Sequence, residues 1–116
     1  MHLDSINLPT PDGRRGILPN HMPIMTPVDI GVMYLTENGK RKKYTVDGGM
    51  FYFENNEATL LTGSVEDAEF IDIARARAAQ LRAEERLRTS QTEYDINRAR
   101  IALNKAINRI NAKEQD

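Results

Sequence analysis

The residues with the clearest chemical potential are two charged side chains in the second half of the chain, Asp72 and Arg75. They stand three positions apart in a segment of helix-forming residues, so both project from one helical face. One interpretation is a surface ion pair that stabilises the helix only slightly. The other is part of a nucleotide site, in which the carboxylate accepts a hydrogen bond from an amino group of the base and arginines bind phosphates through paired N–H groups.

Groups that could catalyse a reaction are not found in the sequence. The absence of cysteine excludes disulfides, thiolate metal sites and cysteine nucleophiles. The two histidines, His2 and His21, are too few for an imidazole metal site. Glu84 and Glu85 are adjacent on the expected helix, so their carboxylates diverge. Because the motifs of P-loop, serine-hydrolase and zinc-protease sites do not occur either, we expect no catalytic residue, no metal and no enzyme activity.

Charge and hydropathy exclude two further classes of protein. The net charge of −1 gives no indication of nucleic-acid binding. No apolar run approaches the roughly 20 residues that are needed to span a bilayer, and the first residues lack the basic and apolar regions of a signal peptide. We therefore expect no nucleic-acid partner and no direct insertion into a membrane.

A change in composition divides the chain near Ser64. All five prolines and all seven glycines precede this residue, whereas eight of the eleven arginines follow it. We interpret the change as a boundary between domains at residues 1–66 and 67–116. The second domain is expected to hold two helices, the first starting just after Ser64 and the second at a capping box that begins at Ser90.

Both expected helices carry apolar seams at spacings of three and four residues, which is typical of coiled coils. The seam positions are Ile71, Ala74, Ala78 and Leu81 in the first helix, and Ile96, Ala99, Leu103, Ala106 and Ile110 in the second. The short connection between the helices predicts an antiparallel hairpin. Because the seam is narrow and half of it is alanine, we expect the hairpin to be marginally stable and able to open.

The first domain has the pattern of a β-structure, with short apolar segments separated by turn residues. Apolar residues alternate at 30–35, and Asn38 with Gly39 is the dipeptide best suited to a type I′ hairpin turn. Residues 40–46 form the returning strand, which Gly48 and Gly49 are expected to interrupt. Short strands between turn signals predict an antiparallel sandwich. The expected fold class is therefore all-β plus all-α, with an N-terminal antiparallel β-sandwich followed by a C-terminal antiparallel two-helix hairpin.

The most specific segment is Gly-Ile-Leu-Pro-Asn-His-Met-Pro at residues 16–23. It resembles the G-I-L-P-x-H-x-P signature of epsilon subunits of rotary F-type ATP synthases. The similarity continues at the glycine pair 48–49, at the strand 58–61 and at Ile-Asp-Ile-Ala-Arg-Ala, residues 71–76. The resemblance implies a non-catalytic central-stalk subunit that couples the gamma subunit to the rotor c-ring. It also implies regulation of ATP hydrolysis through a mobile, ATP-sensing helical hairpin.

The resemblance also assigns residues to a nucleotide site. Carried over by position, the set is Glu66, Ile71, Asp72, Arg75, Arg82, Lys105 and Arg109. It implies that Asp72 accepts from the amino group of the base, that Ile71 packs on the base and that the arginines meet the phosphates. Lys105 stands where the family often has arginine, so the charge is kept and the paired N–H groups are lost. No cofactor is required, and ATP would act as a regulatory ligand.

Three basic residues, Arg98, Lys105 and Arg109, lie on roughly one face of the second helix. Taken alone, they form a solvated basic stripe. The resemblance implies that this face contacts an acidic segment of the catalytic beta subunit when the hairpin extends. It further implies a peripheral location at the cytoplasmic face of the cell membrane.

The sequence departs from the family pattern in two places. The chain is expected to lack the usual first strand, which would leave one edge of the sandwich open. Arg14 stands where the family often has an acidic residue, in a loop that is thought to face the rotor ring. Two other functions stay open, a free-standing ATP-binding regulatory module and a generic β-domain with a coiled-coil adaptor.

Overall fold

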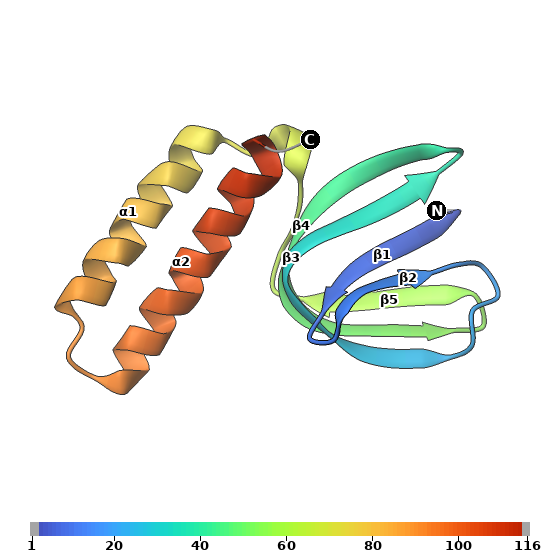
Figure 1. Ribbon diagram of the computed structural model, residues 1–116, viewed down its shortest axis with the longest axis horizontal. Helices are drawn as coiled ribbons and strands as arrows, with labels where there is room; N and C mark the ends of the chain where they lie inside the picture. Colours follow the sequence, from blue (N-terminus) through green and yellow to red (C-terminus); the bar gives the residue numbers. More distant parts are fainter. Residues whose placement is uncertain (1–2, 115–116) are drawn as a thin grey trace. The chain divides into compact units, whose positions relative to one another are not determined.

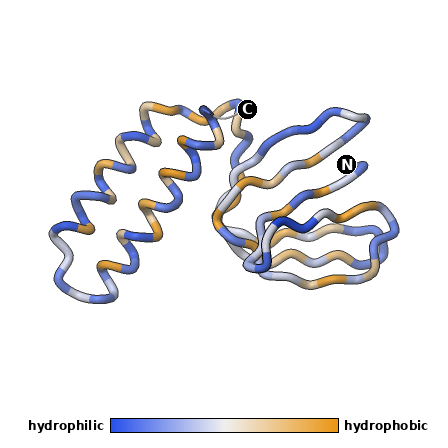
Figure 2. The backbone as a smooth tube through the Cα atoms, viewed as in Figure 1, coloured by the Kyte–Doolittle hydropathy of each residue, from blue (hydrophilic) through white to orange (hydrophobic). Residues whose placement is uncertain are grey.

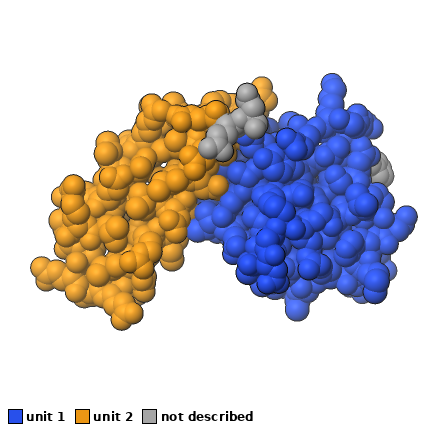
Figure 3. Space-filling model, in the orientation of Figure 1, with its two compact units in different colours: residues 1–67 blue, residues 68–116 orange. Residues whose placement is uncertain are grey.

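The computed structural model describes residues 3–114, so His2 lies outside the described residues. The chain divides into two compact units, residues 1–67 and residues 68–116 (Figure 3). The first unit is an antiparallel β-sandwich and the second contains two antiparallel helices (Figure 1). The predicted fold class is therefore confirmed.

Six strands make up the described part of the β unit. They are β1 (Ser5–Thr10), β2 (Gly13–Ile17), β3 (Ile24–Glu37), β4 (Lys40–Glu54), β5 (Glu57–Thr62) and β6 (Val65–Asp67). Every pair is antiparallel, in the order β2-β1-β3-β4-β5, and β6 pairs with β4. The long β3–β4 hairpin bends so that its two halves belong to different layers (Figure 1). The buried core between the layers is formed by Ile6, Leu8, Ile17, Val28, Met33, Val46, Phe51 and Phe53.

Glycine permits the bend in β4. Gly48 and Gly49 have φ angles of 85° and 137°, which L-residues with side chains rarely adopt. A Cβ atom on Gly49 would lie 1.9 Å from the carbonyl oxygen of Leu61, on the neighbouring strand β5. The prediction that this pair interrupts the strand was wrong, because β4 continues through it and changes layer there. The two glycines therefore allow a single strand, β4, to take part in both layers.

Strand β3 also differs from its prediction, since it begins at Ile24 and includes Pro27. Proline lacks an N–H group and is tolerated where one side of a strand is unpaired. In the part of the chain that the structure describes, this first half of β3 pairs with β4 alone, because β1 pairs only with residues 34–36. At the other end of β3, the turn residues Asn38 and Gly39 have φ angles of 52° and 76°, which a type I′ turn requires. The predicted hairpin turn is therefore confirmed.

The helical unit consists of η1 (Ala68–Phe70), α1 (Ile73–Thr89) and α2 (Glu93–Glu114). The helix predicted to start after Ser64 starts later, because residues 65–67 form β6 and pair with β4. The prediction that a capping box at Ser90 starts the second helix is also wrong. Ser90 ends α1 by donating from its backbone N–H to the carbonyl of Arg86, at 2.9 Å. Thr92 begins α2, since its hydroxyl accepts from the N–H of Asp95 at 3.1 Å.

Buried alanines form the centre of the contact between the helices. They are Ala76 and Ala83 on α1 and Ala99 and Ala106 on α2. On each helix the two alanines stand seven residues apart, so they share a face. The predicted seam of α2 is confirmed, because its alanines are buried and its three larger residues are half-buried. Figure 2 shows hydrophobic positions recurring along both helices between hydrophilic ones.

The predicted seam of α1 was wrong. Ala74, Ala78 and Leu81 are exposed, and Leu81 keeps 67% of its surface accessible. Helix α1 has two apolar stripes, and the buried one contains Ala76 and Ala83. Pairing alanine with alanine lets two helices approach closely, so the stripe whose spacing matches that of the α2 alanines is the one that packs.

Candidate functional site

The Asp72 carboxylate forms the N-cap of α1. Its Oδ1 atom accepts a hydrogen bond from the backbone N–H of Arg75 at 3.2 Å, and the Asp72 backbone is extended, with φ −84° and ψ 106°. An aspartate in this position satisfies one of the unpaired N–H groups of the first turn. The side-chain ion pair between Asp72 and Arg75, one of the two interpretations of these residues, is not formed in the described structure. The side chain of Arg75 is instead exposed.

Two contacts join the end of α2 to the start of the helical unit. The Nζ atom of Lys113 donates to the carbonyl of Glu69 at 2.6 Å, and Arg77 forms an ion pair with Glu114. These contacts fix which ends of the antiparallel helices are adjacent. Arg109 stands one helical turn before Lys113, so it lies at the same end of the hairpin as Asp72.

The structure therefore brings part of the predicted nucleotide set together. Asp72 and Arg75 on α1 lie at the same end as Arg109 on α2. Lys105 lies about 6 Å from Arg109 along the axis of α2, and Arg82 lies about 10 Å from Arg75 along the axis of α1. The side chains of Lys105 and Arg109 are half-buried, whereas that of Arg82 is exposed.

Two members of the set differ in their surroundings. The side chain of Ile71, which precedes α1, is buried, with only 5% of its surface exposed. Glu66 belongs to the β unit, where it lies on β6 opposite Thr45 of β4. The four basic residues of the set thus all belong to the two helices. Their positive charge suits a polyanionic ligand, and among residues 3–114 no three acidic or histidine side chains gather into a metal site.

The three residues predicted for a partner contact all lie on α2. Arg98 and Lys105 are seven positions apart and share a face, and Arg109 continues it one turn later. The guanidinium carbon of Arg98 lies 5.5 Å from the centre of the Tyr94 ring, a cation–π distance. Arg98 is exposed, and the two other side chains are half-buried.

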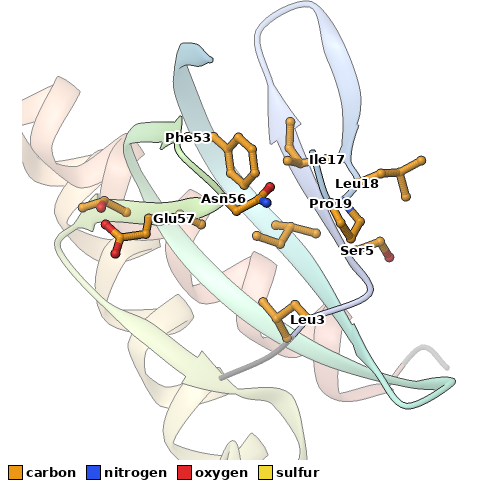
Figure 4. Close-up of a pocket in the computed structure, with 11 residues that line it drawn as sticks. Leu3, Ser5, Ile17, Leu18, Pro19, Phe53, Asn56 and Glu57 are labelled. Atoms are coloured by element: carbon orange, nitrogen blue, oxygen red, sulfur yellow. The ribbon is translucent and has the colours of Figure 1, made fainter. Parts of the chain in front are cut away.

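Sequence reasoning missed a cavity in the β unit (Figure 4). It has a volume of about 710 Å³, and Leu3, Ile17, Phe53 and Asn56 are among the residues that line it. In the described part of the chain β5 pairs with β4 alone, so the other edge of β5 is unpaired. Glu57 of β5 also lines the cavity. No sequence motif indicated the cavity, because its wall combines residues that are far apart in the chain.

Comparisons with known proteins agree with this two-part architecture. The family model of the ATP synthase delta/epsilon chain, β-sandwich domain, matches residues 1–68. The family model of the ATP synthase delta/epsilon chain, long α-helix domain, matches residues 69–114. The ATP synthase epsilon chain of Desulforamulus reducens is 43% identical over 112 residues, which cover 97% of this chain and 85% of the relative. The chain belongs to the ATP synthase epsilon family.

Other members of the epsilon family give the same result. The ATP synthase epsilon chain of Desulfitobacterium hafniense strain DCB-2 is 44% identical over 105 residues, covering 90% of this chain and 79% of the relative. The fold also matches a chain in the structure of Euglena gracilis mitochondrial ATP synthase (OSCP/F1/c-ring), with a TM-score of 0.75 and 22% identity. That match covers 90% of this chain and 66% of the other. The epsilon family thus accounts for both units, in the order in which they occur.

No helix among residues 3–114 is both long enough and apolar enough to cross a membrane.

Proposed function

We propose that this protein is a non-catalytic central-stalk subunit of an F-type ATP synthase, in which it couples the gamma subunit to the rotor c-ring. The observation that carries the proposal is the match of both units, in order, to the two delta/epsilon domains. The subunit would lie at the cytoplasmic face of the cell membrane without entering the bilayer. Its role would be mechanical and regulatory, with the chemistry performed by the catalytic beta subunit.

The hairpin is the regulatory part of the proposal. Every fully buried residue of α1 and α2 is an alanine, and the larger apolar side chains of the seam are only half-buried. Apolar burial stabilises in proportion to area, so this contact between helices is weak. A weak contact supports a hairpin that closes and opens at a small cost in free energy.

ATP would favour the closed state. In the proposed site, the amino group of the base donates to Asp72, while Arg75, Arg82 and Arg109 bind the phosphates, with Lys105 as an additional positive charge. A ligand that binds only the closed hairpin stabilises it by mass action. When ATP is absent, the open hairpin presents its basic face, formed by Arg98, Lys105 and Arg109, to an acidic segment of the catalytic beta subunit.

Co-purification tests the stalk role. The chain would be co-expressed with the gamma subunit of its own organism, and we expect a stable complex at equal stoichiometry in gel filtration. Elution of the two proteins as separate species would contradict the stalk role and favour a free-standing module or an adaptor. Calorimetric titration of the isolated chain with ATP tests the regulatory role separately. Saturable binding is expected, and a flat titration would remove the ATP-sensing part while leaving the stalk role intact.

A further inference from the structure

The positive charge of the β unit is gathered in two short segments. All six Lys and Arg of residues 1–66 lie at positions 14–15 and 40–43, whereas the eight Asp and Glu are spread over the unit. The first segment lies in β2 and the second in β4, on either side of β1 and β3 in the sheet. The fold therefore brings together cations that the sequence separates.

Tyr34 is the point at which these segments meet. It lies on β3, opposite Asn7 of β1 on one side and Lys43 of β4 on the other. The guanidinium carbon of Arg14 lies 5.2 Å from the centre of the Tyr34 ring, and that of Arg41 lies 4.3 Å from it. Arg14 reaches the ring from β2 and Arg41 from β4. We call Arg14, Tyr34 and Arg41 the arginine–tyrosine platform.

The platform is held in place by contacts of its own. The Nε atom of Arg14 donates to Oδ1 of Asn7 at 2.6 Å, and a terminal nitrogen of Arg14 donates to the Asn7 carbonyl at 3.4 Å. Burial of part of the Arg14 guanidinium lowers its pKa from the usual value. Stacking on a ring fixes the plane of a guanidinium and leaves N–H groups at its edge available to a ligand.

Among residues 3–114, no carboxylate forms an ion pair with either arginine of the platform. The ion pairs of this part of the chain include Lys42 with Asp67, Arg77 with Glu114 and Arg88 with Glu85. The side chains of Arg14 and Arg41 are exposed, while the ring between them is half-buried. A pair of oriented, uncompensated guanidinium groups is suited to carboxylates, which bind each fork through two parallel hydrogen bonds.

We propose that the arginine–tyrosine platform is a docking surface for an acidic segment of a partner protein. The two guanidinium carbons cannot be further apart than the sum of their distances to the ring centre. Acidic residues at alternate positions of an extended segment project from one face about 7 Å apart, which lies within this limit. A partner segment with carboxylates at positions i and i+2 therefore fits the platform. This inference concerns the β unit alone and does not rest on the proposed nucleotide site.

A lipid surface fits the platform less well than a protein does. Peripheral binding to anionic membranes combines cations with apolar side chains that enter the headgroup region. Met22, Met25 and Leu61 are exposed large apolar residues of the β unit, and they lie on segments that carry none of its cations. The platform also holds both guanidinium groups over the Tyr34 ring, and hydrogen bonds to Asn7 hold that of Arg14, which favours a ligand whose carboxylates have a defined spacing.

Nuclear magnetic resonance of the full chain tests the proposal. The probe is a blocked peptide that alternates glutamate with threonine, and the readout is the Nε–Hε signals of the arginines. We expect saturable shifts at Arg14 and Arg41, with affinity weakened roughly threefold in R14Q and in R41Q, as for other exposed ion pairs. R100Q, which removes an exposed arginine from α2, should bind as the unaltered chain does.

The ring provides a second test of the same surface. Tyr34→Phe keeps the stacking face and should retain peptide binding, whereas Tyr34→Leu removes the face and should weaken it. Equal binding by the unaltered chain, R14Q and R41Q would overturn the proposal. It would also be overturned if vesicles containing phosphatidylserine bound the chain through these arginines while the peptide did not.

Discussion

The Oδ1 atom of Asp72 lies 3.2 Å from the backbone nitrogen of Arg75 and accepts its hydrogen bond, so one residue caps α1 and also heads the proposed nucleotide site. The two roles need different chemistry. Capping requires a side-chain oxygen, which asparagine and aspartate both provide. The proposed hydrogen bond from the amino group of a base is accepted by the second carboxylate oxygen of Asp72. In asparagine an NH2 group, which is a donor, takes the place of that oxygen.

Asp72→Asn should therefore separate the two roles. We expect helix stability to change by less than about 0.5 kcal/mol, because Asn and Asp are equally good caps. ATP affinity, measured by calorimetry, should fall, because the acceptor for the base is lost. Asp72→Ala serves as the contrast, since it should also destabilise the helix by about 1 kcal/mol in thermal unfolding followed by circular dichroism. Unchanged ATP affinity in the asparagine variant would remove Asp72 from the site.

Arg75→Ala should weaken ATP binding and shift the hairpin towards its open form. Loss of one charge-assisted hydrogen bond corresponds to a decrease in affinity of about tenfold. With ATP present, the amides of α2 should also exchange faster than in the unaltered chain, since less ligand stabilises the closed state. Arg86→Ala is the matched control, because Arg86 is an exposed arginine of the same helix outside the proposed site. The same ATP affinity in both variants would count against the assignment.

The corrected seam of α1 predicts opposite outcomes for two positions that are two residues apart. Ala83 is 2% exposed and faces α2, so Ala83→Leu should overpack the seam and destabilise the hairpin by about 1–3 kcal/mol. Leu81 is 67% exposed, so Leu81→Ala should change stability by less than about 0.5 kcal/mol. Amide exchange of α1 and α2 measures both effects. A larger loss of protection in the Leu81 variant would show that the seam uses the other stripe.

Two asparagines join distant loops of the β unit. The backbone N–H of Asn20 donates to Oδ1 of Asn56 at 2.7 Å, and Nδ2 of Asn56 donates to Oδ1 of Asn20 at 2.9 Å. Asn56→Ala should lower the free energy of unfolding through the loss of both bonds and of the asparagine preference for left-handed φ.

Asn55 offers a matched control for that change. It has nearly the same φ as Asn56, 53° against 59°, and its side chain makes no hydrogen bond in the described structure. Asn55→Ala should therefore show only the backbone part of the effect. The difference between the variants in urea unfolding is expected to be about 1–2 kcal/mol, the net contribution of two hydrogen bonds. No difference would mean that the two loops are not held by these bonds.

Local features of the sequence were sufficient for the main elements. Asn38 with Gly39 predicted a type I′ turn, because the φ angles of that turn exclude most other residues. The loss of glycine and proline after Ser64 predicted helices, and the motif at residues 16–23 indicated the family. Each of these signals lies in a short motif or in the composition of one continuous segment, so it could be recognised without a structure.

Tertiary contacts decided the rest. Which apolar stripe of α1 is buried depends on the alanine spacing of α2, and Gly49 bends β4 rather than ending it because Leu61 lies against it on β5. The arginine–tyrosine platform likewise exists only because strands β2 and β4 flank β1 and β3. These features depend on residues that are distant in the chain and adjacent in space. The sequence by itself determined the main elements, and packing between them determined which faces and charges meet.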